Sequence, residues 1–539
     1  MDRQPHLDSR SVVAALKSAA RKWPDRVYLG EGERKLTFGE VDLLTNRIAN
    51  GLTELGIKKG DSVCTILDTH IDAILMWYGI NKIGAISAPV NTSYVGEYLR
   101  HQVSDCRAEL IIAESHYIDR LNRIAEGLPR AKRVIYRGEK PDSSHWPTAA
   151  FETIVSRDAG NPGTEVLPSD LSMLIYTSGT TGPSKGCMIS HSYACQHARV
   201  MNGAHGMNYD DVIWMPLPLF HLVGTCGLSL GALMVGARVE LIHKFSVSNF
   251  WNEIESTGTN FVLMMGSMLQ LVAAAPDTDA AKRCYGQIRM VCGAPLPASV
   301  KAAWQERFGV KAIGSPGYGQ TEVSIVTRHR IGDPQPDGTS GQRFADYDVR
   351  IMNDDGTECP PGMPGEVCIR PLVPGAMFDG YWGRPEATLA VFRDLWLHTG
   401  DLGVFDADGY FTFVDRKKDY LRKGGENISS MEMEAVFLSH PDIADVAIHA
   451  VPSDVAEDDV KATVILREGA KLREEDLCRW AIDRIPAFAV PRFIEFRDGL
   501  PRTPTGKVLK VELRKDAVTP TTWDREKSDL RTRKSLATA

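Results

Sequence analysis

Strand and helix patterns alternate along the N-terminal half of the chain, and this alternation constrains the fold more than any other feature. The segment Thr37–Glu40 has the pattern of a capping box, and the helix predicted after it ends near Gly56. Another helix is predicted at about 71–83. The predicted strands of this part are 62–67, 85–90, 110–113, 171–176, 238–242, 261–264 and 290–292. Since strands that alternate with helices form βαβ units, we expect an α/β fold with largely parallel sheets in two αβα subdomains.

The pattern changes after about residue 330, where glycine and proline become frequent. Short alternating strands at 349–352, 366–370 and 410–414 predict a small antiparallel sheet or β-barrel. An α+β pattern follows, and the tail from about residue 519 is polar and non-periodic, which predicts disorder. The elements expected before that tail are a helix from 429 to about 441, strands 446–451, 462–466 and 493–496, and a helix at about 474–484.

Composition and charge exclude several classes of protein. Of the 539 residues 43% are hydrophobic and 24% are charged, which is typical of a globular protein with about two to four compact units. The 62 Lys and Arg residues against 69 Asp and Glu residues give a net charge of −7. A protein built around nucleic acid is usually basic, so we expect no nucleic-acid partner.

The segment 212–237 carries no formal charge and is the one candidate for a membrane span. Pro216, Pro218 and His221 lie in its first half and glycines follow, so a buried strand, loop and helix is the better interpretation. The first residues contain no apolar segment of a signal peptide. The ten cysteines form no Cys-x-x-Cys pair, which is typical of reduced thiols. We therefore expect a cytoplasmic protein without a membrane span.

The segment Tyr176–Gly186 follows an apolar strand and consists almost entirely of glycines and hydroxyl residues with one lysine, Lys185. Glycines let backbone N–H groups approach an anion closely, and the lysine adds a positive charge, so such a loop suits a polyphosphate. It is not a Walker A loop, because the residues that flank the lysine are displaced. A solvated loop is the alternative for a generic segment of this composition.

This segment resembles the phosphate-binding loop of the adenylate-forming superfamily, which includes acyl-CoA synthetases. The superfamily's further motifs occur in its order, and the matches extend from about residue 30 to 515. They are Leu217–His221, Cys292–Pro295, Tyr318–Glu322, Trp396–Asp401, Val414–Lys418, Arg422–Gly425 and Pro501–Lys507. Within the superfamily the chain is most similar to fatty-acid and carnitine-CoA-ligase-like synthetases.

The resemblance implies a large N-terminal domain, 1–417, and a small mobile α+β domain, 418–539, with the hinge at Lys418. ATP and Mg²⁺ are implied as ligands, with Glu322 and Thr177 at the metal, Tyr318 stacked on adenine, and Asp401 and Arg416 at the ribose. Lys507 is implied to supply the decisive charge of the first step, so Lys507, Thr177 and Glu322 are the expected catalytic residues. The complete implied nucleotide site is Thr177, Ser178, Gly179, Thr180, Thr181, Gly182, Lys185, Gly293, Ala294, Pro295, Tyr318, Gly319, Gln320, Thr321, Asp401, Arg416 and Lys507.

The resemblance also implies a second step in which coenzyme A attacks the acyl-adenylate after the small domain has rotated. The expected acyl and CoA residues are His221, Met264, Ser315, Gly317, Arg422, Gly424, Gly425 and Glu426. Many relatives have other residues at the positions of Arg422–Gly424, which leaves the individual CoA contacts open.

The implied activity is that of an acyl-CoA synthetase, in which a carboxylic acid and ATP give acyl-AMP and pyrophosphate, and CoA then gives acyl-CoA and AMP. The expected pocket segments 220–227, 261–268 and 315–318 contain no acidic residue. This favours a neutral fatty, cyclic or steroid side-chain acid over carnitine. A crotonobetaine or carnitine ligase, an adenylating enzyme with another acceptor such as a carrier-protein thiol, and a homodimer stay open as alternatives. A nucleotide-binding protein that has lost its activity would be expected to lack Glu322, Asp401 or Lys507, and all three are present.

Overall fold

The computed structural model describes most of the chain. The described residues are 9–177, 183–293, 296–314, 317–329, 336–417, 421–423, 426–428, 430–452, 458–482, 484–485, 489–502, 506, 508–528 and 530. The side chains at positions 422, 423, 426, 427 and 432 also lie outside the described part.

Two compact units make up the chain. The first comprises residues 1–349 with 369–396, and the second comprises 350–368 with 397–539. The boundary expected after residue 417 falls within the second unit, and Lys418 lies outside the described residues. The hinge therefore stays a prediction.

One seven-stranded sheet of the first unit has the strand order β7-β6-β5-β3-β4-β8-β9. Its neighbouring strands are parallel except β8 and β9, which form an antiparallel hairpin. The bounds are β3 (Ser62–Ile66), β4 (Ile86–Pro89), β5 (Leu110–Glu114), β6 (Arg133–Arg137), β7 (Thr148–Ala150), β8 (Leu171–Thr177) and β9 (Lys185–Ser190). Every residue of β3 and β5 is buried, as expected for strands covered on both faces.

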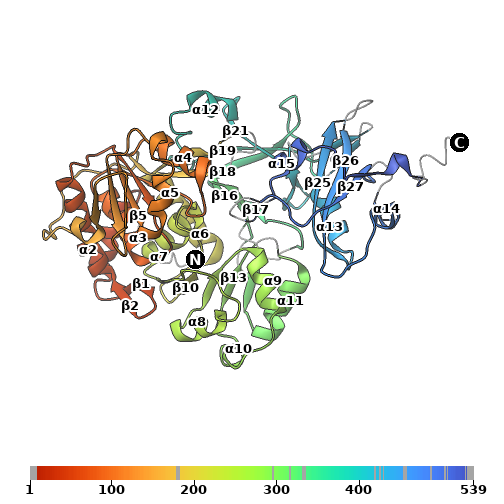
Figure 1. Cartoon of the computed structure of the whole chain (residues 1–539). Helices are drawn as coiled ribbons and strands as arrows, with labels where there is room; N and C mark the ends of the chain where they lie inside the picture. The colour runs from red at the N-terminus through yellow and green to blue at the C-terminus, as the bar shows by residue number, and fades with distance from the viewer. Residues whose placement is uncertain are drawn as a thin grey trace. The chain divides into compact units, whose positions relative to one another are not determined.

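The other seven-stranded sheet has the order β14-β13-β12-β10-β11-β1-β2 and is parallel except at its edge pair β1 and β2. The bounds are β1 (Val27–Glu31), β2 (Arg34–Thr37), β10 (Val212–Met215), β11 (Arg238–Leu241), β12 (Phe261–Leu263), β13 (Met290–Cys292) and β14 (Ala312–Gly314). Helices α9 (Gly266–Ala274) and α11 (Ala298–Phe308) lie beside β13 in Figure 1. Residues of both helices and of β13 belong to one hydrophobic cluster. These two sheets confirm the predicted α/β class with two parallel-rich parts.

The remaining strands form smaller sheets. Their orders are β15-β16-β17, β18-β19-β21-β20 with β22 beside β21, β23-β24, and β25-β26-β27-β28. The bounds are β15 (Tyr318–Gln320), β16 (Ser324–Arg328), β17 (Gln342–Arg343), β18 (Tyr347–Met352), β19 (Gly365–Pro371), β20 (Phe392–Arg393), β21 (Trp396–Phe405), β22 (Phe411–Arg416), β23 (Leu421–Lys423), β24 (Glu426–Ile428), β25 (Ile443–Pro452), β26 (Asp458–Leu466), β27 (Phe493–Phe496) and β28 (Trp523–Asp524). The small sheet predicted after residue 330 is thus present.

The four helices whose positions were predicted, α2, α3, α13 and α14, lie close to those positions. The helices of the described residues are α1 (Val12–Lys22), α2 (Phe38–Glu54), α3 (Ile71–Lys82), α4 (Gly96–Asp105), α5 (Ile118–Asn122), α6 (His191–His205), α7 (Gly231–Val235), α8 (Phe250–Thr257), α9 (Gly266–Ala274), α10 (Asp279–Arg283), α11 (Ala298–Phe308), α12 (Pro385–Val391), α13 (Ser430–Leu438), α14 (Glu474–Ile482) and α15 (Lys510–Lys515). Short 3₁₀ turns are η1 (Ser115–Tyr117), η2 (Ala125–Gly127), η3 (Phe151–Ile154) and η5 (Arg525–Lys527), and η4 (Val223–Leu230) is a π-helix. The predicted capping box at α2 is formed, with Thr37 and Glu40 each bonded to the other's backbone N–H.

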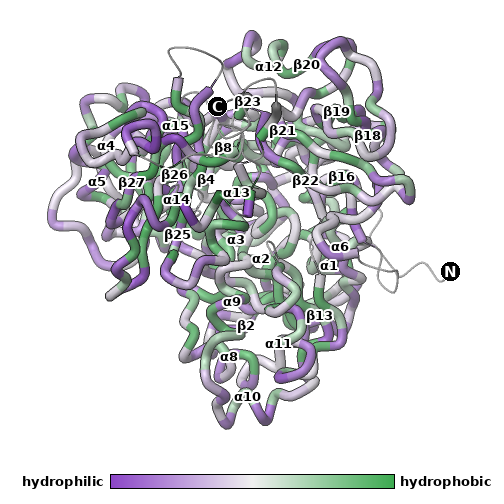
Figure 2. Tube along the Cα trace, turned by 90° about the vertical axis from the view of Figure 1, so that its right-hand side faces the viewer, coloured by the Kyte–Doolittle hydropathy of each residue, from purple (hydrophilic) through white to green (hydrophobic). Residues whose placement is uncertain are grey.

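The uncharged segment 212–237 forms β10, η4 and α7, as predicted from its prolines and glycines. Within the described part of the chain, no helix is both long and apolar enough to cross a bilayer. All ten cysteines are buried thiols. Figure 2 shows hydrophilic residues along the surface loops, for example around α10.

The tail differs from the sequence expectation of disorder from about residue 519. Trp523 and Asp524 form β28, which pairs antiparallel with β27, and η5 follows. The Trp523 side chain packs against the hydrophobic core of the second unit. Backbone pairing and burial of one aromatic ring order this segment although its local sequence is polar, because both contacts come from residues distant in the sequence.

Gly51 of α2 lies against the backbone of η3 and gives a prediction on stability. A Cβ atom at this position would lie 1.9 Å from the carbonyl oxygen of Ile154. Alanine normally stabilises a helix relative to glycine, but here Gly51→Ala is expected to lower the free energy of unfolding by about 1–3 kcal/mol. Urea unfolding followed by circular dichroism measures this. Gly499→Ala is the control, since a Cβ there meets nothing within 4 Å; equal stability of both variants would contradict the close contact.

Candidate active site

The β8–β9 hairpin presents the loop that was predicted to bind phosphate. Thr177 ends β8, Lys185 begins β9, and the two are cross-strand partners. The end of the loop is held by α4, because His101 Nε2 lies 2.7 Å from the carbonyl oxygen of Ser184 and Gln102 Nε2 donates to the Ser184 hydroxyl at 3.2 Å. Residues 178–182, which include most of the predicted phosphate contacts, lie outside the described residues.

Glu322, the predicted metal ligand, lies in the turn between β15 and β16. The Tyr381 hydroxyl donates to Glu322 Oε1 at 2.8 Å, and the backbone N–H of Phe378 donates to the Glu322 carbonyl at 2.9 Å. Lys185 Nζ lies 4.3 Å from the centroid of the Tyr381 ring. Tyr381 therefore connects Lys185 and Glu322, which are far apart in the sequence.

Tyr381 was not identified from the sequence. Its partners come from β9 and from the β15–β16 turn, so no local pattern marks its role. The position of an aromatic pair between Gly380 and Gly383 was the only available signal. Burial and the adjacent Glu322 carboxylate raise the pKa of Tyr381 far above its ordinary value, so its hydroxyl stays protonated and donates.

The carboxylate of Glu322 is suited to a divalent cation. Among the described residues its partner is the neutral Tyr381 hydroxyl, and no lysine or arginine forms an ion pair with it. Carboxylate and hydroxyl oxygens, here those of Glu322 and Thr177, are ligands that Mg²⁺ accepts together with phosphate oxygens. These residues fit Mg²⁺, which when bound would neutralise charge on the polyphosphate.

Several residues predicted for the nucleotide site, together with Gly317 and Ser315 of the predicted acyl pocket, follow the ends of β13 and β14 or lie in and after β15. Gly317 has a φ of +102°, and a Cβ atom there would lie 2.0 Å from the carbonyl oxygen of Thr327, so only glycine fits. Tyr318 begins β15 and is 7% exposed. Gly293 follows β13, and Gly319, Gln320 and Thr321 lead to Glu322. Ala294, Pro295 and Ser315 lie outside the described residues.

In the second unit, the two residues predicted at the ribose are brought together by strand pairing. Asp401 of β21 faces Arg416 of β22, with Arg416 Nε 3.4 Å from Asp401 Oδ1. Asp401 is buried, and its backbone N–H donates to the Thr399 hydroxyl, which in turn donates to the Val367 carbonyl. The acidic side chain is thus held in a fixed position.

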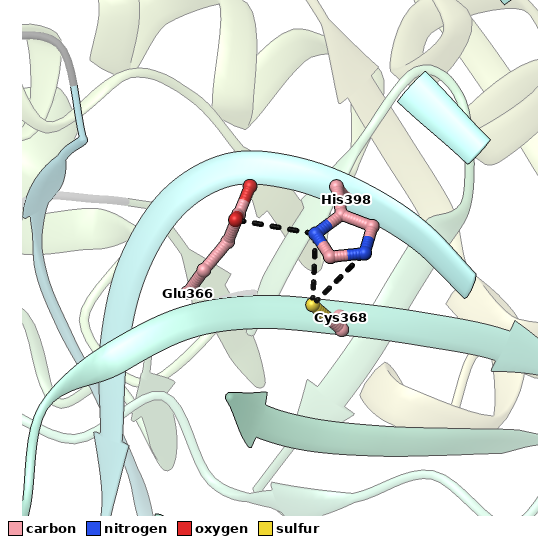
Figure 3. A group of neighbouring side chains, drawn as sticks. All are labelled: Glu366, Cys368 and His398. Atoms are coloured by element: carbon pink, nitrogen blue, oxygen red, sulfur yellow. Dashed lines mark hydrogen bonds and ion pairs between the residues drawn. The ribbon is translucent and has the colours of Figure 1, made fainter. Parts of the chain in front are cut away.

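A second group of polar side chains on β19 and β21 supports the part of β21 that carries Asp401. His398 Nδ1 lies 3.2 Å from Glu366 Oε2 and 3.4 Å from Cys368 Sγ (Figure 3). Although these are possible zinc ligands by type, Lys417 Nζ lies 3.1 Å from the same Glu366 Oε2 and would repel a cation. Glu366 Oε1 accepts from the backbone N–H of Gly400 at 3.2 Å, so we interpret the group as a support for the residue before Asp401.

The pKa of Glu366 agrees with this supporting role. Burial opposes its ionisation, but the hydrogen bonds from His398 and Lys417 outweigh burial and lower the pKa below its ordinary value. Glu366 therefore stays ionised at neutral pH and remains an acceptor for Gly400.

The predicted acyl and CoA residues are placed only in part. His221 is half-buried and lies two residues before η4, and its carbonyl accepts from the Thr225 hydroxyl at 3.0 Å. Met264 is 1% exposed within the hydrophobic cluster around β12 and β13. The backbone of Arg422 and Glu426 lies in β23 and β24, whereas their side chains, Gly424, Gly425 and Lys507 lie outside the described residues.

Comparison with known proteins defines the class of this chain. The family model "AMP-binding enzyme" matches residues 16–382, and the model "AMP-binding enzyme C-terminal domain" matches residues 432–507. The chain therefore belongs to the AMP-binding enzyme family, which confirms the resemblance to adenylate-forming enzymes.

Individual proteins that are similar to this chain have more specific names than the family models. The chain is 32% identical to a crotonobetaine/carnitine–CoA ligase of Salmonella arizonae, over 91% of this chain and 98% of the relative. It is also 32% identical to the enzyme of the same name from Proteus mirabilis, over 89% and 93%. Among solved structures, the anthranilate CoA ligase AuaEII in complex with anthranoyl-AMP is 27% identical, with a TM-score of 0.81 over 96% of this chain and 98% of that chain.

The Tyr381 hydroxyl gives a prediction on activity. Tyr381→Phe is expected to lower the rate of pyrophosphate release about fivefold to thirtyfold, because the hydrogen bond to a charged carboxylate is lost. The release assay with ATP and Mg²⁺ measures this. Tyr117→Phe is a matched control, since the Tyr117 hydroxyl also donates to a carboxylate, that of Asp68, at 2.7 Å. A loss of the same size in the control would refute a specific role.

Proposed function

We propose that this protein is an ATP-dependent, AMP-forming acyl-CoA synthetase. The observation that carries the proposal is the convergence of Thr177, Lys185 and Glu322 through Tyr381 in a chain of the AMP-binding family. The names of the relatives support CoA as the acceptor. ATP, Mg²⁺ and CoA are the proposed small-molecule ligands.

In the first step the carboxylate of the acid attacks the α-phosphorus of ATP, the bond to the β-phosphate breaks, and pyrophosphate leaves. Lys185 and the hairpin loop bind the polyphosphate, Thr321 contacts the α-phosphate, and Asp401 accepts from the ribose hydroxyls. Lys507 stabilises the charge that develops on the phosphoryl oxygens. In the second step the CoA thiolate attacks the acyl carbon and AMP leaves, after a rotation at Lys418 that brings the Arg422–Glu426 segment to the acyl-adenylate.

For the acyl group we propose an apolar fatty, cyclic or steroid side-chain acid. The segments 220–227, 261–268 and 315–318 carry no acidic residue that could balance a trimethylammonium group. The second candidate is crotonobetaine or carnitine, which the names of the relatives at 32% identity favour. A carrier-protein thiol is the alternative acceptor; a cytoplasmic location and a homodimer stay expectations.

The test is pyrophosphate release with ATP and Mg²⁺ over a panel of acids, with and without CoA. The panel contains short, medium and long fatty acids, a steroid side-chain acid, benzoate, crotonobetaine and carnitine. Release that depends on one acid, together with the mass of its CoA thioester, would establish the activity and the substrate class. Release without a thioester would assign another acceptor, and a thioester formed only from crotonobetaine or carnitine would overturn the proposed apolar substrate.

A further inference from the structure

The turn that carries Glu322 contains a residue in an unfavourable backbone conformation. Ser324, at the end of this turn, has a φ of +65° and is 1% exposed. A non-glycine residue in the left-handed region costs about 1–2 kcal/mol, so the surrounding structure must hold it there. The residues that do so come from helix α6.

Tyr193 of α6 contacts the start of the turn. Its hydroxyl donates to the carbonyl oxygen of Thr321 at 2.7 Å. One buried hydroxyl thus satisfies the backbone carbonyl that directly precedes Glu322. Tyr193 is 0% exposed, so water does not compete for this bond.

His197 lies one helical turn further along α6, on the same face as Tyr193. Its Nδ1 is 2.7 Å from the Ser324 hydroxyl oxygen. Burial lowers the pKa of His197 to about 3, so the ring is neutral at neutral pH. Nδ1 and the Ser324 hydroxyl therefore share one hydrogen bond, whose donor is set by the ring tautomer, and Nε2 has no hydrogen-bond partner among the described residues.

Helix α6 is also connected to the other side of the site. It begins at His191 directly after β9, the strand that starts with Lys185. The same continuous segment, β9 followed by α6, therefore carries Lys185 at its start and contacts the Glu322 turn through Tyr193 and His197.

We propose that Tyr193 and His197 are positioning residues that hold the Glu322 turn in the conformation needed to bind the divalent cation with ATP. Neither residue is proposed to touch the nucleotide. The inference rests on the proposed function only in that Glu322 binds the cation that accompanies ATP.

The affinity for ATP, measured by calorimetry with Mn²⁺ and again with EDTA, tests this. The dissociation constant in EDTA divided by the one with Mn²⁺ gives the factor by which the cation strengthens ATP binding. In Tyr193→Phe this ratio is expected to fall about fivefold to tenfold, while the affinity in EDTA stays within about twofold of wild type. A general loss of structure would weaken both affinities by the same factor. A ratio that stays at the wild-type value would therefore overturn the proposal.

Variants of His197 provide a second measurement. His197→Leu removes the hydrogen-bonding group and is expected to lower the ratio, whereas His197→Asn retains an amide group that can hydrogen-bond near the position of Nδ1 and is expected to restore most of it. Tyr28→Phe and His205→Asn are matched controls, because Tyr28 is a buried tyrosine bonded to Tyr78 and Ser229, and His205 is a buried histidine of α6 bonded to Met201. If the ratio for His197→Asn is no higher than the ratio for His197→Leu, a role for the Nδ1 hydrogen bond is contradicted.

These outcomes are separable from the test of the proposed function. ATP binding is measured without an acid or CoA, so the result stands even if no acid of the panel is converted. If wild type binds ATP equally well with Mn²⁺ and with EDTA, Glu322 is not a ligand of the cation and the positioning role is refuted.

Discussion

Replacing Lys507 with alanine is expected to lower the rate of acyl-adenylate formation by about 10²–10³-fold, while thioester formation from a supplied acyl-adenylate stays near the wild-type rate. In the first step negative charge develops on the phosphoryl oxygens, and a positioned ammonium stabilises it. In the second step the thiolate attacks the acyl carbon and AMP is the leaving group, so a cation placed for attack on the phosphorus is not required. Stopped-flow measurement of each half-reaction separates the two steps.

Gly425 supplies the complementary variant. Gly425→Leu is expected to preserve adenylate formation and to slow the thioester step, since a bulky side chain would obstruct the narrow pantetheine arm near the backbone. If both variants lose both half-reactions equally, the proposed exchange of Lys507 for the Arg422–Glu426 segment by rotation at Lys418 is wrong.

The second large effect is expected at Glu322. Glu322→Gln retains the size of the side chain and an acceptor for the Tyr381 hydroxyl, but it removes the negative charge. Because a neutral amide is a much weaker ligand of a hard cation, pyrophosphate release is expected to fall by about 10²–10³-fold at low Mg²⁺.

The dependence on Mg²⁺ concentration distinguishes a metal ligand from a structural residue. Higher Mg²⁺ is expected to restore part of the activity of Glu322→Gln. Glu253→Gln is the control, since the Glu253 carboxylate accepts from Trp214 and Asn249 in another part of the same unit. An activity of Glu322→Gln that does not respond to Mg²⁺ would contradict the role of a metal ligand.

The fold was largely predictable because its strongest signals are local. The capping box at Thr37–Glu40, the apolar strands such as β3 and β8, and the glycine stops depend on residues within a few positions of one another. The tail was not predictable in the same way, because the pairing of β28 with β27 and the burial of Trp523 depend on residues about 30 positions away.

For the candidate site too, some features follow from local motifs and others from tertiary contacts. The sequence by itself determined which segments carry the hairpin predicted to bind phosphate, the Glu322 turn and the part of β21 around Asp401, since each is a short motif with the residue types that its predicted chemistry requires. Only the tertiary structure decided that Tyr381 contacts both Lys185 and Glu322, that Tyr193 bonds to Thr321, and that His197 bonds to Ser324. The physical reason is that these hydrogen bonds connect residues more than 50 positions apart, and their partners become defined only when strands and helices pack.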